Sequence, residues 1–97
     1  MNTSPGLPVE TKKRLELLAG RLRAARKARG WTQERLATAA SVGISTIRAI
    51  EHGEASTSIG SYLAVLWALD LDSGIDQLVP ADVAAASVGF PPIDTAF

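Results

Sequence analysis

The sequence contains no cysteine and only one histidine, His52. Without thiols the chain can form neither a disulfide framework nor a thiolate zinc site, and one imidazole cannot hold a metal ion by itself. We therefore expect no metal and no other cofactor. The absence of cysteine also indicates a reducing compartment, for which the cytoplasm is the default.

No stretch of the sequence is long and apolar enough to cross a membrane. The longest apolar run covers residues 62–69, whereas a spanning helix needs about 20 apolar residues. The first residues, MNTSPGLPVETKKR, also lack the apolar segment of a signal peptide. We expect a protein that is neither secreted nor bound to a membrane.

The sequence also lacks a recognisable catalytic constellation. It has no glycine-rich phosphate loop, no nucleophile paired with a base and no carboxylate pair placed by a motif. Glu51 and Glu54 lie three residues apart, and packing and solubility explain them more simply than catalysis does. We therefore predict that the chain is not an enzyme.

Both signs of charge are present in equal amounts, but they are divided unevenly along the chain. The net charge is zero, from 10 basic and 10 acidic residues. Residues 10–35 hold nine basic and three acidic residues, so this segment carries +6 and the remainder carries −6. The asymmetry indicates either an electropositive face for a polyanion or an ordinary solvated basic helix.

Glycine and proline residues divide the chain into an arm at residues 1–8, a helical body at residues 9–79 and a tail at residues 80–97. Apolar spacing and helix-end signals, among them Thr32 as an N-cap and Pro80 as a terminator, predict an all-α body. Its five helices are expected at about residues 9–29, 33–40, 44–52, 59–69 and 73–79. The tail has no sustained apolar period, so we expect it to have neither a core of its own nor a long helix.

The segment WTQERLATAASVGISTIRAIEHG, residues 31–53, is predicted to form two short helices joined by a tight turn. Where two such helices cross at a steep angle the contact needs a small side chain, and Ala37 lies at that position. Apolar residues of both helices surround it: Leu36, Ala40, Val42, Ile47 and Ile50. The opposite side of the second helix is then free to project, which suits the major groove of duplex DNA.

This segment resembles the helix-turn-helix of the phage-repressor and Cro family, also called the Xre family. Counting from Gln33, that family has an apolar residue fourth, alanine fifth, and apolar residues eighth, tenth, fifteenth and eighteenth, as this chain does. The preceding RLRAARKARGWTQ and the closing IEHG are also typical, and the similarity covers about residues 15–79. One departure is Ser41, where the family prefers glycine because the backbone angle is positive; we expect the nearby Gly43 to relieve the strain.

The resemblance implies a compact five-helix domain that acts as a sequence-specific DNA-binding transcriptional regulator. It further implies a repressor or autorepressor that binds a near-palindromic operator as a homodimer, with two half-sites about 34 Å apart. Small members of this family without an effector domain are often antitoxins. The segment SYLAVLWALDLDSGIDQLV, residues 61–79, resembles the HipB-type partners of kinase toxins of the HipA family. The alternative from another class is a helical protein-interaction module that no longer binds DNA; its best support is Ile44 and Ala49, at positions where long polar side chains often occur.

A rotation of about 100° per residue places Ser45, Ala49 and His52 opposite the inward-facing Ile47. Arg48 flanks them, so Ser45, Arg48 and Ala49 are the predicted base readers. Arg48 can pair with guanine, Ser45 can hydrogen-bond a base edge, and Ala49 can contact a thymine methyl group. Ile44 lies towards the apolar side, yet the family often reads a base from this position. It is either at the edge of the core or in contact with a thymine methyl group.

Phosphate contacts are expected at the start of the second helix, from Thr32 and Gln33, where free amide groups and the helix dipole attract an anion. Thr46 and His52 resemble weaker phosphate-contact positions of the family, and the alternative is that they are simply exposed.

Arg26 lies at the edge of an apolar stripe, where an unpaired charge would be costly. The family joins the corresponding residue to the one at Glu51 by an ion pair, and this leaves a guanidinium edge for a phosphate.

The tail carries apolar residues although it is interrupted by Gly89, Pro91 and Pro92. Either these residues fold back on the body or on a dimer mate, or they fold upon a protein partner such as a toxin. The expected docking residues are Phe90, Ile93 and Phe97.

Overall fold

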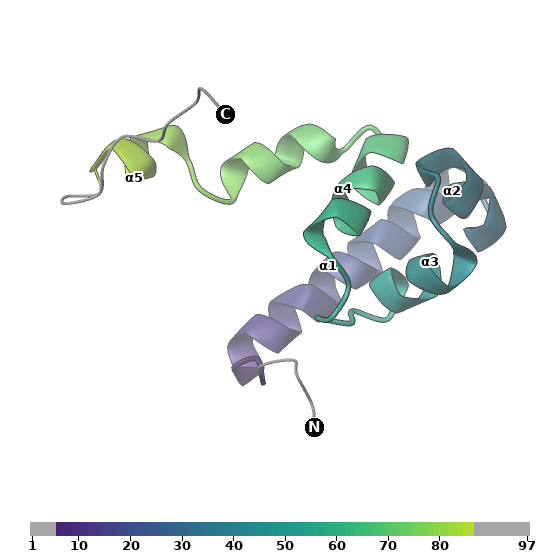
Figure 1. The fold of residues 1–97 in the computed structure, drawn as a ribbon, viewed down its shortest axis with the longest axis horizontal. Coiled ribbons are helices and arrows are strands. Elements are labelled where there is room, and N and C mark those ends of the chain that lie inside the picture. Colours follow the sequence, from purple (N-terminus) through teal and green to yellow (C-terminus); the bar gives the residue numbers. More distant parts are fainter. Residues whose placement is uncertain (1–5, 87–97) are drawn as a thin grey trace.

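The computed structural model describes residues 6–86, and every regular element in that range is helical (Figure 1). The α-helices are α1 (Val9–Ala28), α2 (Gln33–Ala40), α3 (Ile44–Glu51), α4 (Ile59–Ala68) and α5 (Ala81–Ala86), and a 3-10 helix, η1 (Asp72–Gln77), lies between the last two. The expected all-α fold class is confirmed. The expected docking residues Phe90, Ile93 and Phe97 lie outside the described residues.

One apolar core holds the first four helices together. α2 packs against α3 and α4, and α1 packs against α3. The largest fully buried side chains come from all four helices: Leu22, Leu36, Ile47, Ile50 and Val65. Burial of each such side chain contributes roughly 1.5 to 3 kcal/mol, so this core fixes the relative positions of α2 and α3.

Side-chain caps and glycines set the ends of the helices close to where the sequence predicts them. The hydroxyl of Thr32 accepts a hydrogen bond from the backbone N–H of Arg35 at 3.0 Å, and Ser58 accepts one from the N–H of Ser61 at 3.1 Å. Each bond satisfies an amide that the first turn leaves without a helical partner. After α3 the chain turns at Gly53, whose φ of 73° favours glycine.

The region after α4 differs from the expectation at two points. Residues 72–77 form a 3-10 helix where an α-helix at residues 73–79 was expected, and an additional α-helix forms at Ala81–Ala86. The first segment contains Gly74 and buries no residue, so little packing supports regular α-helical geometry. The second helix follows Pro80, whose carbonyl accepts from the N–H of Ala84 at 3.0 Å. Proline is tolerated at a helix start, and the sequence ADVAAA is rich in the best helix-forming residue.

We call residues 70–86 the C-terminal extension. In Figure 1 its two helices run away from the four-helix body. Neither η1 nor α5 contains a buried residue. Residues 70–86 therefore contribute no buried side chain to the core.

Ser41 ends α2 in the left-handed region, with φ 56° and ψ 41°. The expectation that Gly43 would relieve this strain is wrong, because Gly43 is extended, with φ −72° and ψ 155°. Gly43 is the residue immediately before α3. The reversal of the chain after α2 therefore depends on the positive φ of Ser41. A non-glycine residue in this region costs about 1 kcal/mol or slightly more.

We expect Ser41→Gly to raise the free energy of unfolding by up to about 1 kcal/mol, since it removes the left-handed strain but adds unfolded-state entropy. Urea denaturation measures the change. The control is Ala24→Gly, at an exposed position within α1, which should lower stability by roughly 0.5 to 1 kcal/mol. Equal destabilisation by both substitutions would show that the turn stores no strain.

Candidate nucleic-acid interface

The turn between α2 and α3 holds the two helices in a fixed crossing. Ala37 is buried at 7% exposure and its carbonyl accepts from the N–H of Val42 at 3.0 Å. Leu36 and Ile47 are both fully buried beside it. The small side chain at the crossing lets the helices approach closely, as the sequence pattern predicts. One side of α3 is thereby committed to the core.

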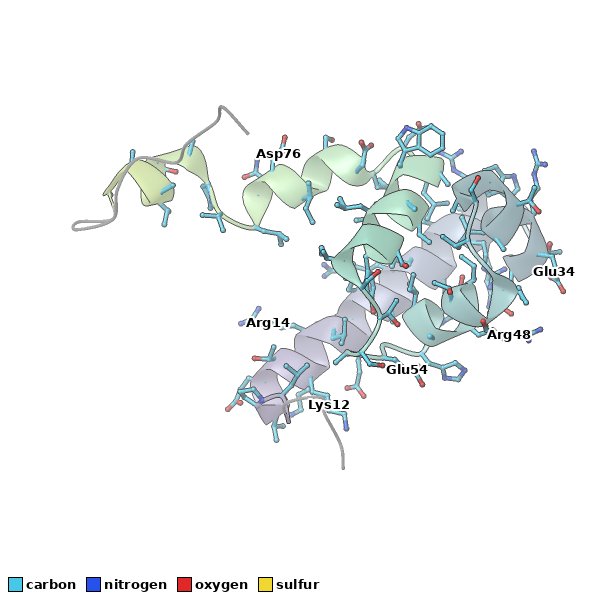
Figure 2. The ribbon with its side chains drawn as sticks, viewed as in Figure 1. Lys12, Arg14, Glu34, Arg48, Glu54 and Asp76 are labelled. Carbon is cyan, nitrogen blue, oxygen red and sulfur yellow. The ribbon has the colours of Figure 1, made fainter. Side chains whose placement is uncertain are left out.

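The other side of α3 faces outward. Ser45, Arg48 and His52 are exposed, and Figure 2 shows Arg48 projecting away from the body. Thr46 and Ala49 are half-buried. The projecting side thus offers one cation, one hydroxyl and one imidazole, with a small apolar residue between them.

Ile44 lies at the start of α3 and is half-buried against the core. The structure therefore places this side chain at the core edge, which is one of the two positions expected for it. Its remaining exposed surface lies on the first turn of the helix, next to Ser45.

A buried ion pair joins α1 to α3. The Arg26 Nε lies 2.7 Å from Glu51 Oε2, and Arg26 Nη2 donates to Oε1 at 3.1 Å. Arg26 is 8% exposed and Glu51 is 2% exposed. Arg26 Nη1 donates to the carbonyl of Trp31 at 2.8 Å. Bidentate geometry and burial make this pair stronger and more costly to break than a surface pair.

Two further side chains complete this network, and both were missed by the sequence interpretation. The side-chain amide of Gln33 donates to Glu51 Oε1 at 3.1 Å, and Arg23 Nη1 donates to the Glu51 backbone carbonyl. The start of α2 and the end of α3 are therefore tied to the same carboxylate. The amide of Gln33, expected to face a phosphate, is turned inward here. No sequence spacing links Gln33 to Glu51, so only the fold could reveal the contact.

Arg26 is also expected to contact a DNA phosphate, and its burial affects that role. Its guanidinium is hydrogen-bonded to both Glu51 and Trp31, and most of its surface is covered. The structure thus uses Arg26 internally, and contact with a phosphate stays a prediction.

Two guanidinium groups lie close to the ring of Trp31, beside the start of α2. The Arg29 and Arg35 guanidinium carbons lie 5.3 Å and 5.4 Å from the centre of its ring, within the range of cation–π attraction. Arg29 also donates to the Leu69 carbonyl at 3.0 Å and to Asp70 at 3.1 Å. These contacts fasten the end of α1 to the end of α4 and hold the loop that precedes α2.

Tyr62 on α4 holds the loop after α3. Its hydroxyl donates to the carbonyl of Glu54 at 3.2 Å. Burial, and then the negative charge of Glu54, raise the pKa of Tyr62 above its ordinary value. The hydroxyl therefore stays a donor throughout the neutral range.

Within residues 6–86, no group of three His, Cys, Asp or Glu side chains is placed to hold a metal ion. No helix in the same range has the length and apolar character needed to cross a membrane.

Two short helices crossing at an alanine, with the second helix exposed on one side, define a helix-turn-helix domain. A family model described as Helix-turn-helix matches residues 22–72, just over half of the chain. The chain therefore belongs to the Xre-like helix-turn-helix family of DNA-binding transcription regulators, a regulatory family that is typically non-enzymatic. No match was found among curated proteins or among solved structures.

We expect Glu51→Ala to lower the free energy of unfolding by about 3 to 5 kcal/mol, because it leaves Arg26 buried without its counter-charge. Thermal or urea unfolding without DNA measures the loss. The matched control is Asp70→Asn, which removes the charge from the exposed pair with Arg29. Asparagine tolerates the positive φ of this position, so the substitution should cost less than about 1 kcal/mol. Similar losses in the two variants would contradict a special role for the buried pair.

Proposed function

We propose that this protein is a transcriptional repressor that binds a near-palindromic operator as a homodimer and blocks access of polymerase. The observation that carries the proposal is the rigid mounting of α3: the core and the Arg26–Glu51 pair fix one side, and the other side is exposed. A helix held in this way fits the major groove, where each base pair has a distinct donor and acceptor pattern. Two such helices in a dimer read half-sites about 34 Å apart.

The proposed base readers are Ile44, Ser45, Arg48 and Ala49. Arg48 is exposed and can make a bidentate contact with guanine, which is the commonest specific contact in the major groove. Ser45 can donate or accept at a base edge. Ile44 and Ala49 are half-buried, so each can offer only its outer methyl surface to a thymine methyl group.

The proposed phosphate contacts surround the start of α2 and the ends of α3. Thr32 caps α2, and the amides and dipole at this helix start attract a phosphate. Gln33 is half-buried beside Thr32. Figure 2 shows Glu34, next to them in the chain, on the same side of the molecule as Arg48. Thr46 and His52, on α3 and at its end, would contact phosphates of the DNA backbone. Arg26, on α1, is the remaining proposed phosphate contact.

A narrower role as the antitoxin of a HipA-type toxin rests on the sequence resemblance. In this role the operator would control the gene of the protein itself, and the segment with Phe90, Ile93 and Phe97 would bind the toxin. These three residues lie outside the described part of the chain. Co-purification of a toxin encoded by the adjacent gene would support this role.

Binding of duplexes selected from a random pool, followed by fluorescence anisotropy, tests the function and the reading helix. Wild-type affinity should fall with salt, with a slope of about −0.9 for each neutralised phosphate. We expect Arg48→Ala to weaken binding to the selected site by about 1 to 3 kcal/mol. Arg48→Lys keeps the charge but loses the bidentate geometry, so it should preserve the salt slope and relax the choice of base pair.

Unchanged affinity and specificity in Arg48→Ala would remove Arg48 from the reading surface. A wild-type protein that enriches no duplex and binds none in a salt-dependent manner would favour the protein-interaction module instead.

Gln33→Ala is expected to weaken binding to selected and unrelated duplexes by a similar factor, because a phosphate contact carries no sequence information. The same titrations measure this. The control is Gln77→Ala, which removes an identical, exposed side chain from η1 and should leave both affinities unchanged. A loss confined to the selected duplex would contradict a phosphate contact, and would show that Gln33 either positions α3 through Glu51 or reads a base.

A further inference from the structure

An open apolar groove lies on the body beside the C-terminal extension. It has a volume of about 390 Å³, and α1, α4 and the extension contribute its walls. Its apolar wall residues include Leu15, Leu18, Ile59, Leu66, Ile75 and Leu78. Several of them remain exposed, with Ile59 at 62% and Leu78 at 68%. A contiguous apolar surface of this kind marks a contact site rather than a solvated face.

The C-terminal extension itself needs a packing partner. Its α-helix, α5, has six residues and buries none of them, and an isolated helix of that length is not stable in water. Beyond the groove wall, Val79 is 65% exposed. The extension therefore presents apolar side chains that its own body leaves largely uncovered.

Charge complements the apolar surfaces. The extension contains four acidic residues and no basic one: Asp70, Asp72, Asp76 and Asp82. On α1, Arg14 and Arg21 lie about 40° and 60° from Leu18 around the helix, on the side away from Leu15. Both therefore lie next to the Leu18 wall of the groove without lining it. Neither arginine forms an ion pair within residues 6–86, where the salt bridges are Arg26–Glu51 and Arg29–Asp70.

Within one chain these charges do not meet. Figure 2 shows Arg14 on the edge of α1 that faces the extension, whereas Asp76 lies on the far edge of the extension. The extension of the same chain already forms one wall of the groove, through Ile75 and Leu78. It therefore cannot also fill the groove.

We propose that the groove receives the C-terminal extension of a second copy of this chain, and that the two copies exchange extensions reciprocally. Each copy carries both halves of the contact: an apolar groove with Arg14 and Arg21 next to its Leu18 wall, and an apolar, acidic extension. Such a self-complementary contact closes at two subunits. α3 contributes no residue to the groove, so both reading helices stay uncovered. The inference rests on the proposed homodimer and assigns its surface.

Charge reversal tests this exchange in the full-length protein. One variant, Arg14→Glu with Arg21→Glu, has acidic residues on both contact surfaces. The other, Asp76→Arg with Asp82→Arg, has basic residues on both. All four positions are exposed, and circular dichroism checks that each variant keeps its helices. Analytical ultracentrifugation then measures the dimer dissociation constant without DNA.

We expect each variant alone to dimerise at least about tenfold more weakly than wild type, because like charges face each other in both contacts. An equimolar mixture should recover nearly wild-type affinity, because both contacts of the mixed dimer are then complementary. The control, Lys13→Glu with Lys27→Glu, makes the same charge change at exposed positions of α1 that lie at least about 120° from both Leu15 and Leu18, and it should leave dimerisation unchanged. Recovery in the mixture is the result that a merely destabilised variant cannot produce.

A wild-type protein that is monomeric at about 100 µM, a concentration far above that needed for a stable repressor dimer, would overturn the inference. The same holds for a dimer that neither charge reversal weakens, or one that the mixture fails to restore. Operator binding is measured separately with wild type. Loss of the exchange together with intact operator binding refutes only this inference, and an exchanged dimer without DNA binding refutes only the proposed function.

Discussion

The buried pair between Arg26 and Glu51 is the interaction on which the arrangement of this domain depends. Its two charges are 8% and 2% exposed, so each requires the other, and neither can be lost without leaving an uncompensated charge in the interior. The same carboxylate accepts from Gln33 at the start of α2, and the guanidinium donates to the carbonyl of Trp31. One charge pair thus sets α1, the approach to α2 and the end of α3 relative to one another.

This mounting supports the proposed role of α3 in reading DNA. Apolar packing fixes the inner side of the helix through Ile47 and Ile50, and packing alone tolerates small rotations because it is not directional. The hydrogen bonds to Glu51 are directional, so they restrict such rotations. Arg48, three residues before Glu51, is then presented in a defined direction. A reading helix needs this property, because specific contacts with base edges depend on geometry.

Much of the fold could be predicted because its signals are local. Thr32 and Ser58 mark helix starts by their own hydroxyl groups, and the spacing of Leu36, Ile47 and Ile50 identifies the faces that become buried. The exposed side of α3, with Ser45 and Arg48, follows from the same periodicity. Such features depend on residues within one or two turns, and the helix-turn-helix pattern adds a fixed separation between two neighbouring helices.

The sequence by itself determined the all-α class, the ends of the first four helices and the outward side of α3, since these follow from short-range periodicity and capping. Tertiary structure alone decided the contact between Gln33 and Glu51, 18 residues apart, and the position of Arg29 against Asp70. It also decided that the chain after α4 leaves the body and borders an apolar groove with Leu15 and Leu18. These contacts join residues that are far apart in the sequence. Local spacing does not determine which of the available distant partners a side chain contacts.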